Sequence, residues 1–224
     1  MKTQHLLPFI LLLAACSTPD GGYPGTYQAN PIDEPAVILS LERNGAAVLM
    51  QDVNGPVPYA DEGNWLGSED SLDVTFDGGA VLTFGRGDDD SLALVDDLTG
   101  MAPAGLVLYP TTPLIGTWVW LQTTASGQVT DPSTAEAFTL TFNPQGHASM
   151  GTDCNSGTGA FLVGPQRQLS MPMIATTRMF CEGSNEGYYY AQLGLVESYS
   201  ITADGVLELH LGGDGGTMEF SPEA

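Results

Sequence analysis

Residues 151–181 read GTDCNSGTGAFLVGPQRQLSMPMIATTRMFC and contain two of the three cysteines of the chain, Cys154 and Cys181. Gly157 and Gly159 lie between them and permit backbone conformations that other residues resist. Short apolar runs inside the stretch, separated by a Gly-Pro turn, indicate a hairpin. The stretch therefore reads as strands and turns that need a core from elsewhere in the chain.

The flanking sequence supplies that core. Before the stretch, three apolar residues alternate with threonines as in a half-buried strand: Phe138, Leu140 and Phe142. After it, residues 184–196 have apolar side chains at helical spacing, with Ser184 as a candidate N-cap and Glu186 in the first turn. Further alternating runs end at Phe220. This order predicts an antiparallel sheet crossed by a single helix.

The same patterns resemble the META domain of the HslJ-like envelope proteins. The motifs occur in the family's order: an opening GTW, an F-x-L-x-F strand, a G-x-x-C-N-x-x-x-G turn and a T-x-R-M-x-C segment. The matching residues are Gly116 and Trp118, then Gly151, Cys154, Asn155 and Gly159, then Thr177, Arg178, Met179 and Cys181. The resemblance implies the fold. Because the family has no established chemistry, it assigns no catalytic residue.

The first residues have the features of a bacterial lipoprotein signal. Lys2 supplies the positive charge, residues 6–15 are apolar, and Leu13-Ala14-Ala15-Cys16 resembles a lipobox. About ten apolar residues are too few to span a bilayer, which takes ~20. We expect residues 1–15 to be removed and Cys16 to carry the acyl chains; an ordinary signal peptide with a chance cysteine is the alternative.

The residues after Cys16 predict the location of the protein. Residues 16–24 are rich in Gly, Pro and Ser and read as a tether. Ser17 follows the cysteine, at the position where an aspartate would resemble a signal for retention at the inner membrane. The sequence therefore predicts a lipid anchor in the periplasmic leaflet of the bacterial outer membrane.

The charge of the chain excludes some partners. It has 27 acidic and 5 basic residues, for a net charge of −22. Such a surface repels nucleic acid and anionic lipid headgroups, so we expect neither as a partner. Cation binding is conceivable, but the acids are scattered through turns rather than grouped at ligand spacing, which favours a solvated acidic surface.

The N-terminal half has strand alternation throughout and no helical period. It opens with Gly25-Thr26-Tyr27, turns at Arg43-Asn44-Gly45 and again at Asp77-Gly78-Gly79. These features resemble the N-terminal domain of NlpE-like lipoproteins. Members of that family have a C-x-x-C pair linked to copper, whereas residues 30–34 read NPIDE here. The resemblance therefore implies the fold and no copper site.

Prolines between residues 103 and 113 mark a boundary between the two halves. We predict an NlpE-like β domain over residues 25–110 and a META domain over residues 114–222. The expected fold is mainly β, with two small antiparallel β-barrel-like modules in tandem. The second module is α+β, because its single helix packs on the sheet.

Cys154 and Cys181 are the sharpest candidate pair. In an oxidising periplasm, with Cys16 lipidated, they most simply form a disulfide, which the chain-entropy model values at roughly 3.5 kcal/mol. Two buried free thiols or a redox pair are alternatives, although no C-x-x-C brings them together. A zinc site could add His147 and His210, but no ligand spacing pre-forms half of it.

The sequence gives little support to catalysis. G-x-S-x-G is absent, and no two carboxylates stand out. Residues 88–90 are three aspartates without calcium-loop spacing, which favours an exposed hairpin tip. Aromatics at residues 118, 120 and 188–190 suit a core better than a ligand groove, with the third tyrosine left exposed.

The sequence therefore predicts no enzyme, no cofactor and no metal. The expected function is that of a non-catalytic outer-membrane lipoprotein in envelope maintenance or stress response. The alternative is a lipoprotein that binds a small ligand or a divalent cation at the open end of a barrel.

Overall fold

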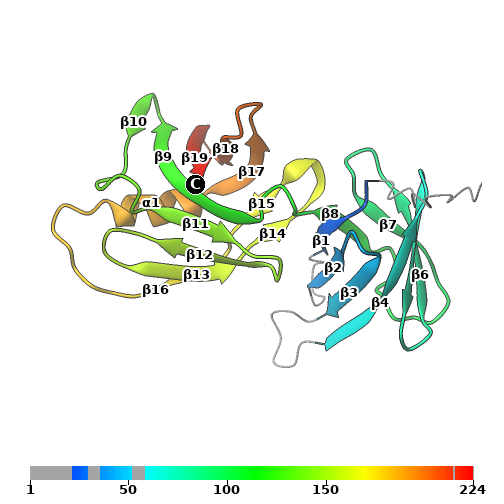
Figure 1. Ribbon diagram of the computed structural model, residues 1–224. Coiled ribbons are helices and arrows are strands. Elements are labelled where there is room, and N and C mark those ends of the chain that lie inside the picture. Colours follow the sequence, from blue (N-terminus) through cyan, green and yellow to red (C-terminus); the bar gives the residue numbers. More distant parts are fainter. Residues whose placement is uncertain (1–21, 30–35, 52–58, 214, 224) are drawn as a thin grey trace, which may run out of the picture.

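The computed structural model describes residues 22–29, 36–51, 59–213 and 215–223. Two β-modules follow one another along the chain (Figure 1), and each has its own cluster of buried apolar side chains. The lipobox with Cys16, most of the tether and the NPIDE segment lie outside the described residues.

Within the described residues, the first module is a closed barrel of eight antiparallel strands. The strands are β1 (Gly25–Ala29), β2 (Val37–Leu41), β3 (Ala46–Gln51), β4 (Tyr59–Gly67), β5 (Ser71–Phe76), β6 (Val81–Arg86), β7 (Leu92–Asp97) and β8 (Val107–Pro110). Each strand pairs with the next, and β8 returns to β1 with Tyr27 opposite Pro110. Closure leaves the sheet without a free edge.

Period-two alternation builds this barrel. In β5, Leu72, Val74 and Phe76 are buried, while the residues between them are exposed. The two predicted turns require glycine, because Gly45 and Gly79 have φ of 90° and 85°. The turn signals of the sequence therefore gave the hairpins correctly.

The second module is a curled sheet that stays open. Its strands are β9 (Gly116–Ala125), β10 (Gln128–Thr130), β11 (Thr139–Phe142), β12 (His147–Gly151), β13 (Ser156–Ala160), β16 (Ile174–Thr176), β17 (Val196–Ile201), β18 (Leu207–Leu211) and β19 (Gly216–Pro222). The order across the sheet is β16-β13-β12-β11-β9-β19-β18-β17, and β10 pairs with β9. A short hairpin, β14 (Leu162–Val163) and β15 (Leu169–Ser170), is joined through the 3-10 turn η1 (Pro165–Arg167).

The described part of the chain contains one α-helix, α1 (Glu186–Leu193), which lies against the sheet of the second module (Figure 1). Tyr189 is fully buried, with its ring 5.2 Å from Trp120, 5.4 Å from Phe138 and 6.4 Å from Phe220 between centroids. This aromatic cluster fixes the helix on the core. No helix in the described ranges is long and apolar enough to cross a membrane.

The predicted helical run of residues 184–196 is longer than the helix. Val196 instead begins β17, where both Val196 and Tyr199 are buried although they lie three positions apart. A β-bulge between Val196 and Ser198 shifts the register and puts both side chains on one face. The overextended prediction has another cause: Val196 is buried and continues the helical spacing of Tyr189 and Leu193, although it belongs to β17. The expected fold class, mainly β with one helix in the second module, is confirmed.

We expect the barrel to depend on its inward-facing leucines. Leu82 is fully buried, so Leu82→Ala should lower the free energy of unfolding by about 2–5 kcal/mol through lost burial and the cavity left behind. Leu66 is 64% exposed on β4, and Leu66→Ala should change it by less than about 0.5 kcal/mol. Denaturant unfolding of both variants measures this. Equal effects would contradict the inward register of β6.

Candidate functional site

Asn155 is the centre of a hydrogen-bond network in the turn between β12 and β13, and its side chain is buried. Its Nδ2 donates to the main-chain oxygen of Met179 at 2.8 Å and to Oε1 of Glu186 at 2.7 Å. Its Oδ1 accepts from Thr177 Oγ1 and from the main-chain N–H of Met179, both at 2.8 Å. One carboxamide therefore joins the turn, the segment after β16 and the helix.

Glu186 ties the first turn of α1 to the same β-turn. Its Oε2 accepts from Thr152 Oγ1 at 2.9 Å and from the Asn155 main-chain N–H at 3.1 Å. Ser184 Oγ accepts from the Glu186 main-chain N–H at 3.2 Å, although the N-cap residue is Asn185. Glu186 therefore stabilises the first turn of the helix and also holds the helix against the turn between β12 and β13.

Asp153 collects hydroxyl donors beside this network. Ser184, Ser133 and Thr134 all donate to its carboxylate, from two segments distant in sequence. Burial alone would raise the pKa of Asp153, but these hydrogen bonds outweigh it and hold the pKa below its usual value of 3.8. The cluster anchors the loop that precedes β11 to the start of α1.

Cys154 and Cys181 are joined by a disulfide across 27 positions, with Cα atoms 5.9 Å apart. Both sulfurs are therefore engaged with each other rather than available to zinc. The two histidines of the formal zinc set lie elsewhere: His147 is exposed on β12, and His210 on β18 lies 3.0 Å from Ser200 Oγ. Within the described residues, no group of three His, Cys, Asp or Glu could hold a metal ion.

The remaining motif residues shape the sheet. Gly116 opens β9, and Trp118 is buried with its indole N–H donating to the Leu114 oxygen at 2.8 Å. Gly151 ends β12, and Gly159 on β13 faces the main-chain oxygen of Met173 so closely that a Cβ would collide with it. Glycine at position 159 therefore lets the chain approach β13 at the start of β16.

The segment held by Asn155 presents apolar side chains to solvent. Met179 is 61% exposed and Phe180 91%, and Met173 before β16 is 81% exposed. Arg178 is exposed beside them. The disulfide and the Asn155 hydrogen bonds fix the main chain under Met179 and Phe180, so the exposure of these two side chains is a defined feature of the surface.

The aromatic residues favour the core interpretation. Trp118 and Trp120 are buried, and the Trp120 indole N–H donates to Thr123 Oγ1 at 3.0 Å. Among the three tyrosines of α1, Tyr189 is buried, and its neighbours on either side are half-buried rather than exposed. These aromatics therefore build the core.

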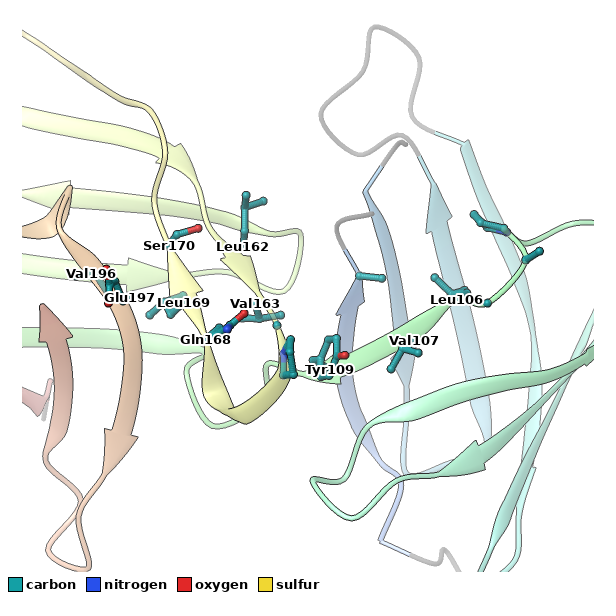
Figure 2. A pocket seen from close by; sticks show the side chains of 16 residues that line it. Leu106, Val107, Tyr109, Leu162, Val163, Gln168, Leu169, Ser170, Val196 and Glu197 are labelled. Carbon is teal, nitrogen blue, oxygen red and sulfur yellow. The ribbon is translucent and has the colours of Figure 1, made fainter. Parts of the chain in front are cut away.

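The two modules meet along β1, β8 and the β14–β15 hairpin. Gln28 Nε2 donates to the main-chain oxygen of Phe161 at 3.2 Å, and Tyr109 of β8 packs against the core of the second module. Figure 2 shows Tyr109 between the barrel and the hairpin that contains Val163. A cleft of about 770 Å³ lies at this junction, lined by Leu106 and Val107 from one module and by Leu169 and Glu197 among others from the second (Figure 2).

Several of these features have no signal in the sequence. Asn155 was found only as a motif residue, and its partners Thr152 and Glu186 had no assigned role together. The pairing of Asp153 with Ser133 joins residues 20 positions apart through a loop without periodicity. The cleft lies between the modules and not at a barrel mouth, because its walls come from both halves of the chain.

We expect Asn155→Ala to destabilise the second module by about 2–3 kcal/mol, because it removes the partner of Oε1 of Glu186 and of the main-chain N–H and oxygen of Met179. The Met179 amide should also exchange its hydrogen faster. Calorimetry and hydrogen exchange measure both effects. Asn64→Ala, at an exposed position of β4, is the control and should leave both unchanged. A Met179 amide that stays protected would contradict the network.

Asp153 should make stability depend on acid pH. Because its folded pKa is lowered, its contribution is fully present above about pH 4 and is lost as pH falls through the folded pKa. The stability difference between the native chain and Asp153→Asn should therefore shrink below that pH. Unfolding free energies from pH 7 to pH 2 test this. Asp204→Asn, at an exposed turn, should show no such trend.

Residues 112–224 match the family of the META domain. No match was found among the curated proteins. Solved structures with some likeness include a protein from Burkholderia xenovorans determined by NMR, at 25% identity over 58% of this chain and 97% of that one, with a TM-score of 0.43.

Two further structures share less of the sequence. One is a DUF4847 family protein from Bacteroides vulgatus, at 15% identity over 48% of this chain and 92% of that one, with a TM-score of 0.38. The other is the Cpx pathway activator NlpE from Escherichia coli, at 18% identity over 69% and 92%, with a TM-score of 0.28. The family match spans half of the chain and contains every motif residue singled out above, from Gly116 to Cys181. The chain belongs to the META domain family.

Proposed function

We propose that this protein is a non-catalytic lipoprotein, anchored through Cys16 at the periplasmic face of the bacterial outer membrane, with a role in envelope maintenance or the response to envelope stress. The observation that carries the proposal is a META domain at residues 112–224 downstream of a lipobox that ends at Cys16. The NlpE-like features of the first module, Gly25-Thr26-Tyr27 and its hairpins, support the same function.

The chemistry around the family motif supports a binding or structural role over catalysis. The polar side chains at the motif make hydrogen bonds that hold neighbouring segments together. The hydrogen bonds of Asn155, Glu186 and Asp153 involve hydroxyls and main-chain groups. A catalytic constellation would instead place a nucleophile beside a base, with both facing a cavity. The motif of this family therefore acts, in our proposal, as a structural lock on the exposed segment that contains Met179.

The anchor also limits the partners. With a net charge of −22, the protein approaches neither nucleic acid nor anionic headgroups, so the membrane contact in this proposal is the lipid on Cys16. Ser17 supports sorting to the outer membrane rather than retention at the inner membrane.

A second candidate function is the binding of a small ligand. The cleft of about 770 Å³ between the modules favours it, because ligand sites in proteins typically measure about 300–1,000 Å³ and often lie between domains. Its walls combine apolar side chains, such as Leu106 and Leu169, with main-chain groups and Glu197. The ligand in this second candidate function is a small organic molecule.

The anchor is tested by mass spectrometry of the protein from envelope fractions. We expect an acylated Cys16 at the N-terminus and recovery with the outer membrane. Cys16→Ala should abolish acylation, and Ser17→Asp should move the acylated protein to the inner membrane. A gene deletion should raise sensitivity to envelope stressors, with rescue by the native chain and not by Cys16→Ala. Full rescue by Cys16→Ala would contradict an anchored role.

A further inference from the structure

A second cleft, of about 510 Å³, shares Tyr109, Val163 and Gly164 with the larger one. Its barrel wall is the loop between β6 and β7, with Asp88, and its opposite wall is the turn η1, with Arg167. The two clefts therefore flank the junction between the modules.

Basic side chains are concentrated in this cleft, although the chain has few of them. The sequence after Cys16 has four arginines and no lysine, and two of the four, Arg86 and Arg167, line the cleft. Arg86 is committed, because it pairs with Asp90 at 2.6 Å and lies 5.1 Å from the centre of the Tyr23 ring. Arg167 has no hydrogen bond or ion pair among the described residues. Burial raises the pKa of the Tyr199 hydroxyl, and the charge of Arg167 partly offsets this rise.

The main chain at Arg167 has an uncommon conformation. Gln166 and Arg167 both have left-handed backbones, with φ of 54° and 61°. Such conformations are rare for residues other than glycine, and they persist where the surroundings impose them. Ser91 lowers the pKa of Asp89 most, and the Gln166 main-chain N–H lies close enough to contribute to the same effect. The turn and the barrel loop thus face each other across the cleft.

The facing loop offers one uncommitted carboxylate. Asp90 pairs with Arg86, and Asp89 accepts hydrogen bonds from Ser91. Asp88 is exposed and makes no hydrogen bond or ion pair within the part of the chain that the structure describes. The cleft therefore presents an available cation on one wall and an available anion on the other, with Tyr109 and Tyr199 in its lining.

We propose that this cleft binds a small zwitterion, a free amino acid or a short peptide, with its carboxylate on Arg167 and its ammonium group on Asp88. The planar guanidinium donates two parallel hydrogen bonds that match a carboxylate. A ligand without net charge also avoids the repulsion that a chain of charge −22 exerts on a plain anion. Arg167 and Asp88 are not part of the lining of the larger cleft, and the site does not depend on the anchor.

The test is calorimetric titration of the full lipidated chain, in detergent, with the dipeptide Ala-Ala and with free alanine. We expect saturable one-to-one binding with a Kd of about 1 mM or tighter. N-acetylation or C-amidation of the dipeptide should each weaken binding about tenfold, because each removes one charged end. No saturable binding of either probe at about 10 mM would overturn the proposal.

The variants locate the site. Arg167→Asn removes the cation while suiting the left-handed backbone, and it should weaken binding about tenfold or more, as should Asp88→Asn. Arg43→Gln and Asp204→Asn remove the same charges at exposed turns and should leave the Kd unchanged. Glu197→Gln changes the larger cleft and should also leave it unchanged. Binding that survives both Arg167→Asn and Asp88→Asn, or that Glu197→Gln abolishes, would overturn the assignment.

Discussion

The carboxamide of Asn155 holds the second module in its form. It is the only type of neutral side chain that offers two donors and two acceptor sites from one rigid plane, and here each side is used. Through it, the turn after β12, the segment that ends at Cys181 and the start of α1 become one unit. The disulfide adds a covalent bond between the turn after β12 and the segment that ends at Cys181. A buried network of this kind is strong only when all of its members are satisfied.

The constraint on the rest of the molecule is that each module has its own core. The barrel buries its alternating side chains inside a closed sheet, and the second sheet buries its own against α1. The contact between them is accordingly small and partly polar, with Gln28 bonded to the Phe161 main chain and Tyr109 seated on the neighbouring core. Junctions of this composition leave space around their contacts, which explains why both described clefts lie there.

The sequence predicts most of the fold and little of the site, for physical reasons. Strand alternation and glycine turns are local, so the β5 strand and the turns at Gly45 and Gly79 could be predicted residue by residue. The end of α1 could not, because Val196, the first residue of β17, continues the helical spacing of the buried Tyr189 and Leu193. The partners of Asn155 come from segments up to 31 positions away, and nothing in their local pattern indicates that they meet. The clefts need both modules in place.

The acidic composition explains how the carboxylates are satisfied. With so few cations, Arg86–Asp90 is the one ion pair among the described residues, so other acids rely on neutral donors. Burial opposes ionisation of Asp97, yet the main-chain N–H groups of Ala102 and Thr99 and the Thr99 hydroxyl hold its pKa below the usual value. Hydrogen bonds from neutral donors weaken less than ion pairs when salt screens charge, while the repulsion among the remaining acids weakens. A fold built this way retains its turns in high salt, and an unpaired arginine such as Arg167 stands out in it because Asp89 and Asp90 on the facing loop already have other partners.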